Sequence, residues 1–102
     1  MTVDHHVARR TIRIRNSLGL HMRAAGSFVR LANSFQSAIS VSHDGNMVDG
    51  KSVLDLMTLG AGCGTVLALE TRGHDAEDAV AALAALISAQ FHESDEHVGQ
   101  PS

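Results

Sequence analysis

Polar and apolar residues alternate along three short stretches of the chain, and a period of two is typical of β-strands. The alternation runs through residues 9–15, 38–43 and 65–71. Asp44-Gly45 follows the second stretch, and Asp-Gly between alternating runs is a typical hairpin turn. We therefore predict four strands, of which residues 46–48 form the short return strand of the hairpin.

Apolar residues recur every three or four positions in two longer stretches, which is the period of an amphipathic helix. These stretches are residues 22–35 and a run that opens at or near Asp75 and continues to Phe91. Residues 52–59 predict a shorter helix, because Ser52 is a favourable N-cap residue. The resulting order β-α-β-β-α-β-α predicts an α+β domain with two layers and a mostly antiparallel sheet.

The length of 102 residues corresponds to one domain. We expect a flexible N-terminus at 1–8, a folded domain at 9–92 and a disordered acidic tail at 93–102, because neither end shows an apolar period. No apolar stretch has the length of a signal peptide or a bilayer-spanning helix, so we expect a cytoplasmic protein without membrane insertion.

Charge and metal-binding residues exclude several classes of function. The formal net charge of −3, with no basic face interleaved with aromatic residues, argues against nucleic acid as a partner. The single cysteine, Cys63, excludes an internal disulfide and fits a reducing compartment. The seven histidines are scattered and show no HxxxH spacing, so we expect neither a metal site nor a cofactor.

His21 stands between a glycine-containing loop and the start of the helix predicted at 22–35. The first N–H groups of a helix lack internal acceptors and carry a partial positive charge, so an anion attached to His21 would meet them. Arg23 adds a fixed cation two residues on. Imidazole can attack phosphorus and leave again, which suits a phosphoryl carrier. A histidine at a helix start is more often an ordinary surface residue, however, and local chemistry leaves both interpretations open.

Residues 19–25 (GLHMRAA) resemble Gly-Leu-His-Ala-Arg-Pro-Ala, the phosphorylation motif of the histidine-containing phosphocarrier protein (HPr) family. This family belongs to the bacterial phosphoenolpyruvate-dependent phosphotransferase system. Residues 50–57 (GKSVLDLM) are similar to a second signature of the family, and the resemblance covers about residues 9–92. It implies an open-faced β-sandwich, in which three helices cover one face of a four-stranded antiparallel sheet.

The resemblance also implies roles for individual residues. His21 would be phosphorylated on Nδ1 by enzyme I and would pass the group to a IIA-type domain, in a sugar-uptake or a nitrogen-regulatory branch. Arg23 would neutralise the phosphate, and Ser52 would be a regulatory serine modified by a serine kinase/phosphorylase. The chain would be a carrier rather than an enzyme, and we expect a monomer.

A partner-binding surface around the phosphorylation site is expected from the same resemblance. Its candidate residues are Met22, Ala24, Lys51, Leu54 and Met57. Met22 stands where the family has a small residue and Ala24 where it usually has proline, a favourable residue in a first helical turn. For Leu54, Met57 and Leu59, spacing does not decide between core and partner surface.

A second function is compatible with the sequence. The domain would then be a regulatory binding module controlled by phosphorylation of Ser52, with little phosphorelay through His21. The intact pair of His21 and Arg23 argues against this alternative, whereas Ala24 slightly favours it. A small hydrolase lacks support, because the chain has no paired carboxylates, nucleophile elbow or phosphate-binding loop.

Overall fold

The computed structural model describes residues 6–93 of the chain. Its elements are β1 (Val7–Arg13), α1 (Met22–Ala32), β2 (Ala38–His43), β3 (Asn46–Asp49), α2 (Val53–Met57), β4 (Val66–Arg72), α3 (Ala76–Ser88) and the short turn η1 (Gln90–His92). The order of strands and helices, βαββαβα, is the predicted one.

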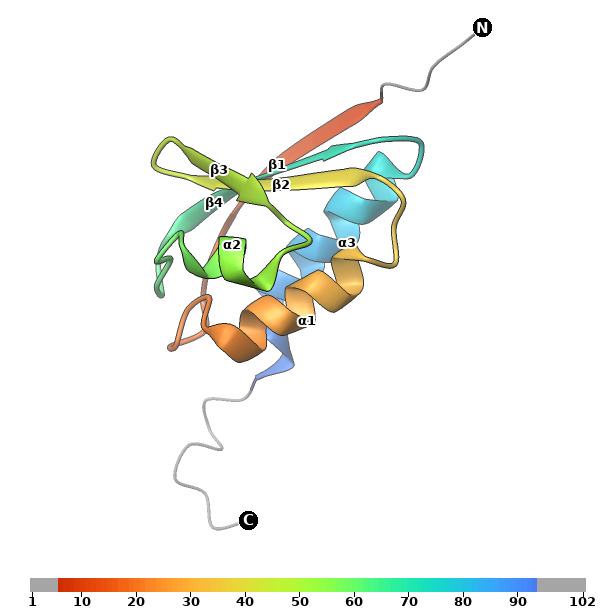
Figure 1. Cartoon of the computed structure of the whole chain (residues 1–102). Helices are drawn as coiled ribbons and strands as arrows, with labels where there is room; N and C mark the ends of the chain where they lie inside the picture. The colour runs from red at the N-terminus through yellow and green to blue at the C-terminus, as the bar shows by residue number, and fades with distance from the viewer. Residues whose placement is uncertain (1–5, 94–102) are drawn as a thin grey trace, which may run out of the picture.

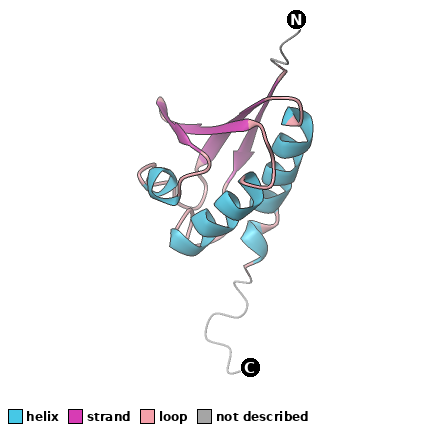
Figure 2. Ribbon diagram, turned by 45° about the vertical axis from the view of Figure 1, so that its right-hand side comes forward, coloured by secondary structure: helices cyan, strands magenta, loops and turns pink. Residues whose placement is uncertain are grey.

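The four strands form one antiparallel sheet in the order β1-β4-β2-β3 (Figure 1). The last strand in sequence therefore lies between the first two, and β2 and β3 form the predicted hairpin. Figure 2 shows the helices on one side of the sheet, while the other side is open. The predicted open-faced sandwich is confirmed.

The core lies between the sheet and the helices, where the alternating strand residues meet the apolar stripes of α1 and α3. Its largest fully buried apolar side chains are Phe28, Ile14, Leu56, Leu67, Leu69, Leu83, Ile87 and Val41. Since the chain has no Trp or Tyr, the aromatic side chains buried in this otherwise aliphatic core are Phe28 and Phe91. Burial of the two helical stripes fixes the start of α1 against the end of α3.

Pairing with β4 sets the bounds of β1. Val7 is opposite Arg72 and Arg13 is opposite Val66, so the strand begins two residues before the predicted 9–15 and ends earlier. Residues 7 and 8, expected in the flexible N-terminus, thus belong to the sheet. The ends of a strand depend on how far it forms backbone hydrogen bonds with the neighbouring strand. The alternation of residues along one strand does not reveal these ends.

The helix expected to continue to Phe91 instead ends at Ser88. Gln90, Phe91 and His92 follow with φ values of 59°, 56° and 61°, in the left-handed region that costs about 1–2 kcal/mol per residue. Phe91 is buried, as the apolar period predicts, but it lies in a turn that reverses the chain and not in the helix. This turn directs Glu93 back toward α1.

Asp75 immediately precedes α3, yet its carboxylate does not cap that helix. Its oxygens accept hydrogen bonds from the backbone amides of Gln36 (2.8 Å) and Ser37 (2.9 Å) and from the Ser37 hydroxyl. These bonds, the hydroxyl's foremost, lower the pKa of Asp75 from 3.8 to about 2. The carboxylate therefore joins the turn between α1 and β2 to the start of α3.

Candidate functional site

His21 is the N-cap residue of α1, with an extended backbone (φ −80°, ψ 179°). The loop before it turns at Gly19, where φ is +69° and a Cβ atom would lie 2.6 Å from the carbonyl oxygen of Ala61. The amide of Leu20 donates to that same oxygen at 2.8 Å. Because only glycine tolerates both the conformation and the close approach, Gly19 fixes the point at which His21 meets the helix.

The Nδ1 atom of His21 faces the N-terminal end of α1. The backbone N–H of Arg23 donates to Nδ1 over 3.3 Å. An N–H donor opposite Nδ1 fits a lone pair on that atom, which corresponds to the tautomer with the ring proton on Nε2. The Ala24 amide makes no hydrogen bond with any described residue and is a further free donor at this helix end. Nδ1 is therefore the nitrogen available as a nucleophile.

The Nε2 atom of His21 contacts a carboxylate from the far end of the chain. Glu93 Oε2 lies 2.5 Å from Nε2, and the two side chains are 17% and 27% exposed, respectively. The other carboxylate oxygen accepts a hydrogen bond from Asn16 Nδ2 at 3.1 Å. Asn16 is fully buried and also donates to the carbonyl of Gly19 at 2.8 Å. Glu93 is thus bound both to the imidazole and to the loop that carries it.

Sequence reasoning missed Glu93, because it assigns residues 93–102 to a disordered tail. The structure corrects this assignment at Glu93; residues 94–102, like residues 1–5, lie outside the described part of the chain. Glu93 and its partner His21 are 72 positions apart in the sequence, and no periodic pattern links two such positions. The available signal is the apolar Phe91 two residues earlier, which indicates that the chain is still packed there.

Arg23 is exposed at the start of α1, beside His21. Its guanidinium forms no ion pair or hydrogen bond with residues 6–93, so its five donors are available to an incoming anion. The phosphate-binding role expected of Arg23 stays a prediction, and the position of this free cation supports it.

Ser52 is the N-cap residue of α2, and its hydroxyl accepts a hydrogen bond from the Asp55 amide at 3.1 Å. The predicted capping role is confirmed by this bond. The neighbouring Lys51, expected at a partner surface, donates from Nζ to the carbonyl oxygen of Phe35 at 2.8 Å. Its ammonium group therefore stabilises the turn after α1, and the partner contact stays untested.

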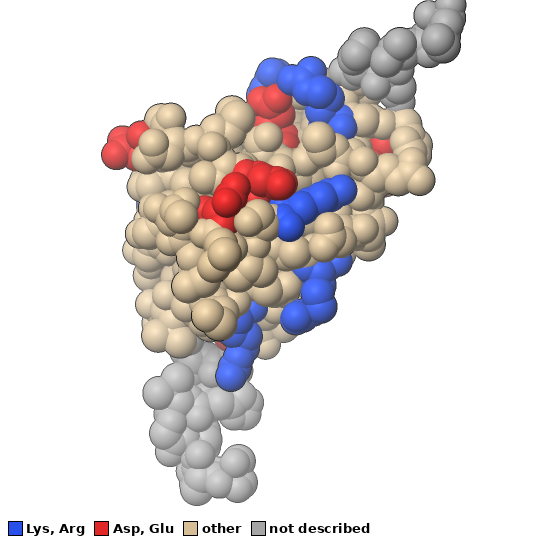
Figure 3. All heavy atoms as spheres, in the orientation of Figure 1, with Lys and Arg blue, Asp and Glu red and all other residues tan. Residues whose placement is uncertain are grey.

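Exposed apolar side chains lie near the start of α1 and on α2. Met22 is 65% exposed, Leu54 is 76% exposed and Met57 is 37% exposed, whereas Leu56 and Leu59 are buried. The alternatives left open by spacing are thus resolved: Leu54 and Met57 are surface residues, and Leu59 belongs to the core. Helix α2 packs against α1 beside its N-terminal half (Figures 1 and 2). Figure 3 shows an area without charged side chains on this face, with acidic and basic side chains at its margin.

Ala24 is fully buried and packs in the core with Ala25 and Phe28. A side chain without exposed surface cannot contact a partner, so its expected place at the partner surface is wrong. Ala24 is the third residue of α1 and lies on the face of the helix that packs into the core. The motif alone does not show which face of the helix this residue occupies.

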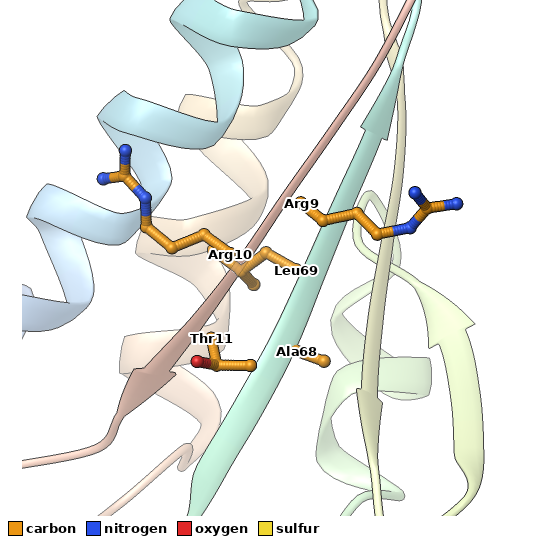
Figure 4. Close-up of a pocket in the computed structure, with 5 residues that line it drawn as sticks. All are labelled: Arg9, Arg10, Thr11, Ala68 and Leu69. Atoms are coloured by element: carbon orange, nitrogen blue, oxygen red, sulfur yellow. The ribbon is translucent and has the colours of Figure 1, made fainter.

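A shallow hollow of about 320 Å³ lies on β1 and β4, away from the helix start that carries His21 (Figure 4). Its lining residues are Arg9, Arg10, Thr11, Ala68 and Leu69. This hollow does not coincide with the candidate site, and it contains no nucleophile resembling the ring of His21. The candidate site is therefore the surface around the imidazole of His21, and not this hollow.

Two searches of the described residues complete the description of the surface. Residues 6–93 contain no group of three or more His, Cys, Asp or Glu residues that could hold a metal ion. Among the helices in this range, none has the length and apolarity needed to cross a membrane. Cys63 is exposed, and its Sγ lies 3.7 Å from the carbonyl oxygen of Arg15.

Comparison with known proteins finds similar sequences over most of the chain. A family model described as "PTS HPr component phosphorylation site" matches residues 8–89. The phosphocarrier protein HPr of Cupriavidus necator is 42% identical over 87 residues, which cover 85% of this chain and 98% of the relative. The phosphocarrier protein HPr of Pseudomonas putida is 44% identical over 87 residues, covering 84% and 97%.

Solved structures show the same similarity. The crystal structure of HPr-C-His from Thermoanaerobacter tengcongensis has a TM-score of 0.82 and 41% identity, covering 85% of this chain and 98% of that one. The structure of a phosphocarrier protein HPr from Bacillus anthracis has a TM-score of 0.77 and 36% identity, covering 79% and 96%.

Proposed function

The chain belongs to the HPr family of phosphocarrier proteins of the phosphotransferase system, and from this membership we propose that His21 carries the phosphoryl group. In this proposal phosphorylated enzyme I donates the group to His21, and a IIA-type domain receives it. The observation that supports this most strongly is the position of Nδ1 at the N-terminal end of α1, where the Arg23 amide donates to it. The chain acts as a carrier in the relay and does not itself catalyse a reaction on a small molecule.

The transfer step is a nucleophilic displacement at phosphorus. The Nδ1 lone pair forms the new P–N bond, while the bond from phosphorus to the donor group breaks and its electron pair stays with the donor. The phosphoryl oxygens then lie next to the N-terminal amides of α1 and within reach of Arg23. In the second step the P–Nδ1 bond breaks, its electron pair returns to Nδ1, and the acceptor on the IIA-type domain takes the phosphoryl group.

Partner docking is proposed for the exposed apolar residues beside this site, Met22, Leu54 and Met57. Exposed apolar side chains that gather near a reactive group are typical of a protein interaction surface. A surface of this kind lets two different partners approach the same imidazole in turn. The relay takes place in the cytoplasm in this proposal.

Regulation through Ser52 is a second proposal, and it extends the alternative of a binding module. Phosphorylation would place about two negative charges at the N-terminus of α2, beside Leu54 and Met57. The charge suits the helix end but opposes an acidic partner surface. Ser52→Asp should therefore weaken transfer from enzyme I, while Ser52→Ala, which loses the cap but adds no charge, should transfer at the wild-type rate.

The proposed function is tested by incubating the chain with enzyme I and phosphoenolpyruvate and measuring its intact mass. We expect the mass of one phosphoryl group to be added, to be lost in acid, and to be absent from His21→Ala. A phosphorylated product that is stable in acid, or that also forms in His21→Ala, would contradict the proposal. Binding of enzyme I by His21→Ala, measured in parallel, distinguishes loss of the acceptor from loss of the fold.

A further inference from the structure

We infer that Glu93 is a positioning residue for phosphoryl transfer at His21, holding the proton on Nε2 in both steps. This role rests on the proposed function and deepens it. It is carried by three observations: the contact between the carboxylate and Nε2, the fixation of that carboxylate by Asn16, and the strained turn that delivers it.

The carboxylate is held in place from both sides. One oxygen lies 2.5 Å from His21 Nε2, and the other accepts a hydrogen bond from Asn16. Asn16 has no exposed surface and donates as well to the carbonyl of Gly19, two residues before His21. Carboxylate, amide and imidazole thus form one chain of hydrogen bonds whose members cannot shift independently.

The backbone before Glu93 adopts a costly conformation to place this carboxylate. Three consecutive residues that are not glycine, Gln90, Phe91 and His92, have positive φ values. Such strain persists where surrounding structure enforces it and is often found at functional sites. Burial of Phe91 holds the turn, and the amide of Glu93 donates to the Gln90 carbonyl at 2.9 Å.

The position of the carboxylate gives it an effect on each direction of transfer. When Nδ1 forms its bond to phosphorus, the ring becomes cationic if Nε2 keeps its proton. A carboxylate at hydrogen-bond distance stabilises that positive charge. When the P–Nδ1 bond breaks, the ring then leaves as neutral imidazole rather than as the unstable imidazolate. The proton stays on Nε2 throughout, so no further acid or base is required.

Other charged groups around the ring act on the phosphate rather than on Nε2. Arg23 follows His21 at the Nδ1 side of the ring, and its exposed guanidinium is free. Glu93 is the carboxylate that contacts Nε2 among the residues the structure describes. The positive charge of Arg23 therefore acts on the Nδ1 side of the ring, and the negative charge of Glu93 acts at Nε2.

The first measurement needs no phosphorylation. In a ¹⁵N-labelled sample, a proton bound between Nε2 and a carboxylate exchanges slowly with water and gives a ring N–H signal at low field. We expect this signal in the wild type and its loss in Glu93→Ala. Asp78→Asn is the matched control, because it removes one carboxylate charge from the opposite end of α3 and should keep the signal.

The second measurement is the rate of transfer from phosphorylated enzyme I to the chain, the step in which the ring of His21 becomes cationic. Glu93→Gln keeps the shape and an acceptor oxygen but removes the charge, and we expect transfer to slow by about tenfold, the ratio between a charged and a neutral hydrogen bond. Asp78→Asn should transfer at the wild-type rate, and thermal unfolding should show all variants folded.

The outcomes separate this inference from the proposed function. Wild-type transfer rates in both Glu93→Gln and Glu93→Ala, or a ring N–H signal that survives in Glu93→Ala, would overturn the role of Glu93 alone. A wild-type chain that shows the ring signal but takes up no phosphate from enzyme I would overturn the proposed function, and the transfer role of Glu93 with it.

Discussion

The Nδ1 atom of His21 lies 3.3 Å from the amide nitrogen of Arg23, and its Nε2 atom lies 2.5 Å from Glu93. At the scale of single residues, these two contacts assign different tasks to the two ring nitrogens. One nitrogen is kept unprotonated at a helix end that favours anions, and the other is kept protonated by a carboxylate. A histidine without both neighbours would have no preferred role for either nitrogen.

Ala24 provides a test at this scale, because its amide is unpaired and its side chain is buried. We expect Ala24→Pro to remain folded and to gain about 0.4–1 kcal/mol in free energy of unfolding, since proline restricts the unfolded chain and breaks no hydrogen bond here. The phosphorylated form should hydrolyse faster, because one amide donor is lost. Urea unfolding and ³¹P NMR measure the two effects, and a stability loss above about 1 kcal/mol would contradict an unpaired amide.

At the scale of elements, α2 presents two faces within five residues. Leu56 is fully buried and Leu54 is 76% exposed. The helix is therefore fixed by one apolar residue and offers its neighbour to solvent. This arrangement places an exposed apolar residue on a helix that could not be stable alone.

The two leucines form a matched pair of variants. We expect Leu56→Ala to lower the free energy of unfolding by about 2–5 kcal/mol, because it leaves a cavity in the core. Leu54→Ala should change that free energy by less than about 0.5 kcal/mol while raising the KM for enzyme I. Chemical denaturation and transfer kinetics measure both. Equal stability losses in the two variants would show that the assignment of the two faces is wrong.

Helix α2 also shows why sequence predicts some elements better than their faces. The capping role of Ser52 follows from local chemistry and is confirmed, whereas five residues are too few for periodicity to separate Leu54 from Leu56. The end of α3 illustrates the converse. There the apolar period continues through Phe91, but the backbone changes to positive φ values at Gln90. Packing of the Phe91 ring in the core favours this turn over another turn of helix.

At the scale of the whole molecule, distant segments are joined by a few polar contacts. His21 could be identified from its motif, and the sheet and its helices from periodicity. The contact between His21 and Glu93 could not, because it depends on how α3 packs across α1 in three dimensions. The link between Asp75 and Ser37 is similar, since a residue that resembles a helix cap binds a different turn.

The Asp75 link predicts a pH dependence of stability. The pKa of Asp75 is lowered to about 2 from 3.8 by hydrogen bonds that the unfolded chain lacks. Its contribution is therefore fully present above about pH 4 and is lost as the pH falls toward about 2. The urea midpoint of the wild type should fall as the pH is lowered through this window. The midpoint of Asp75→Asn should be lower than that of the wild type at neutral pH and should fall less over the same window. Asp78→Asn serves as the control for charge removal, and a wild-type slope in Asp75→Asn would exclude this link as the cause.

The most direct test of the carrier role is an NMR measurement on a chain labelled with ¹⁵N in its histidine rings and phosphorylated by enzyme I and phosphoenolpyruvate. We predict a phosphorus–nitrogen coupling to Nδ1 of His21, which disappears when a IIA-type domain is added and the phosphorus signal moves to that domain. Coupling to any other residue, or a signal that stays on His21 in the presence of the acceptor, would contradict the account.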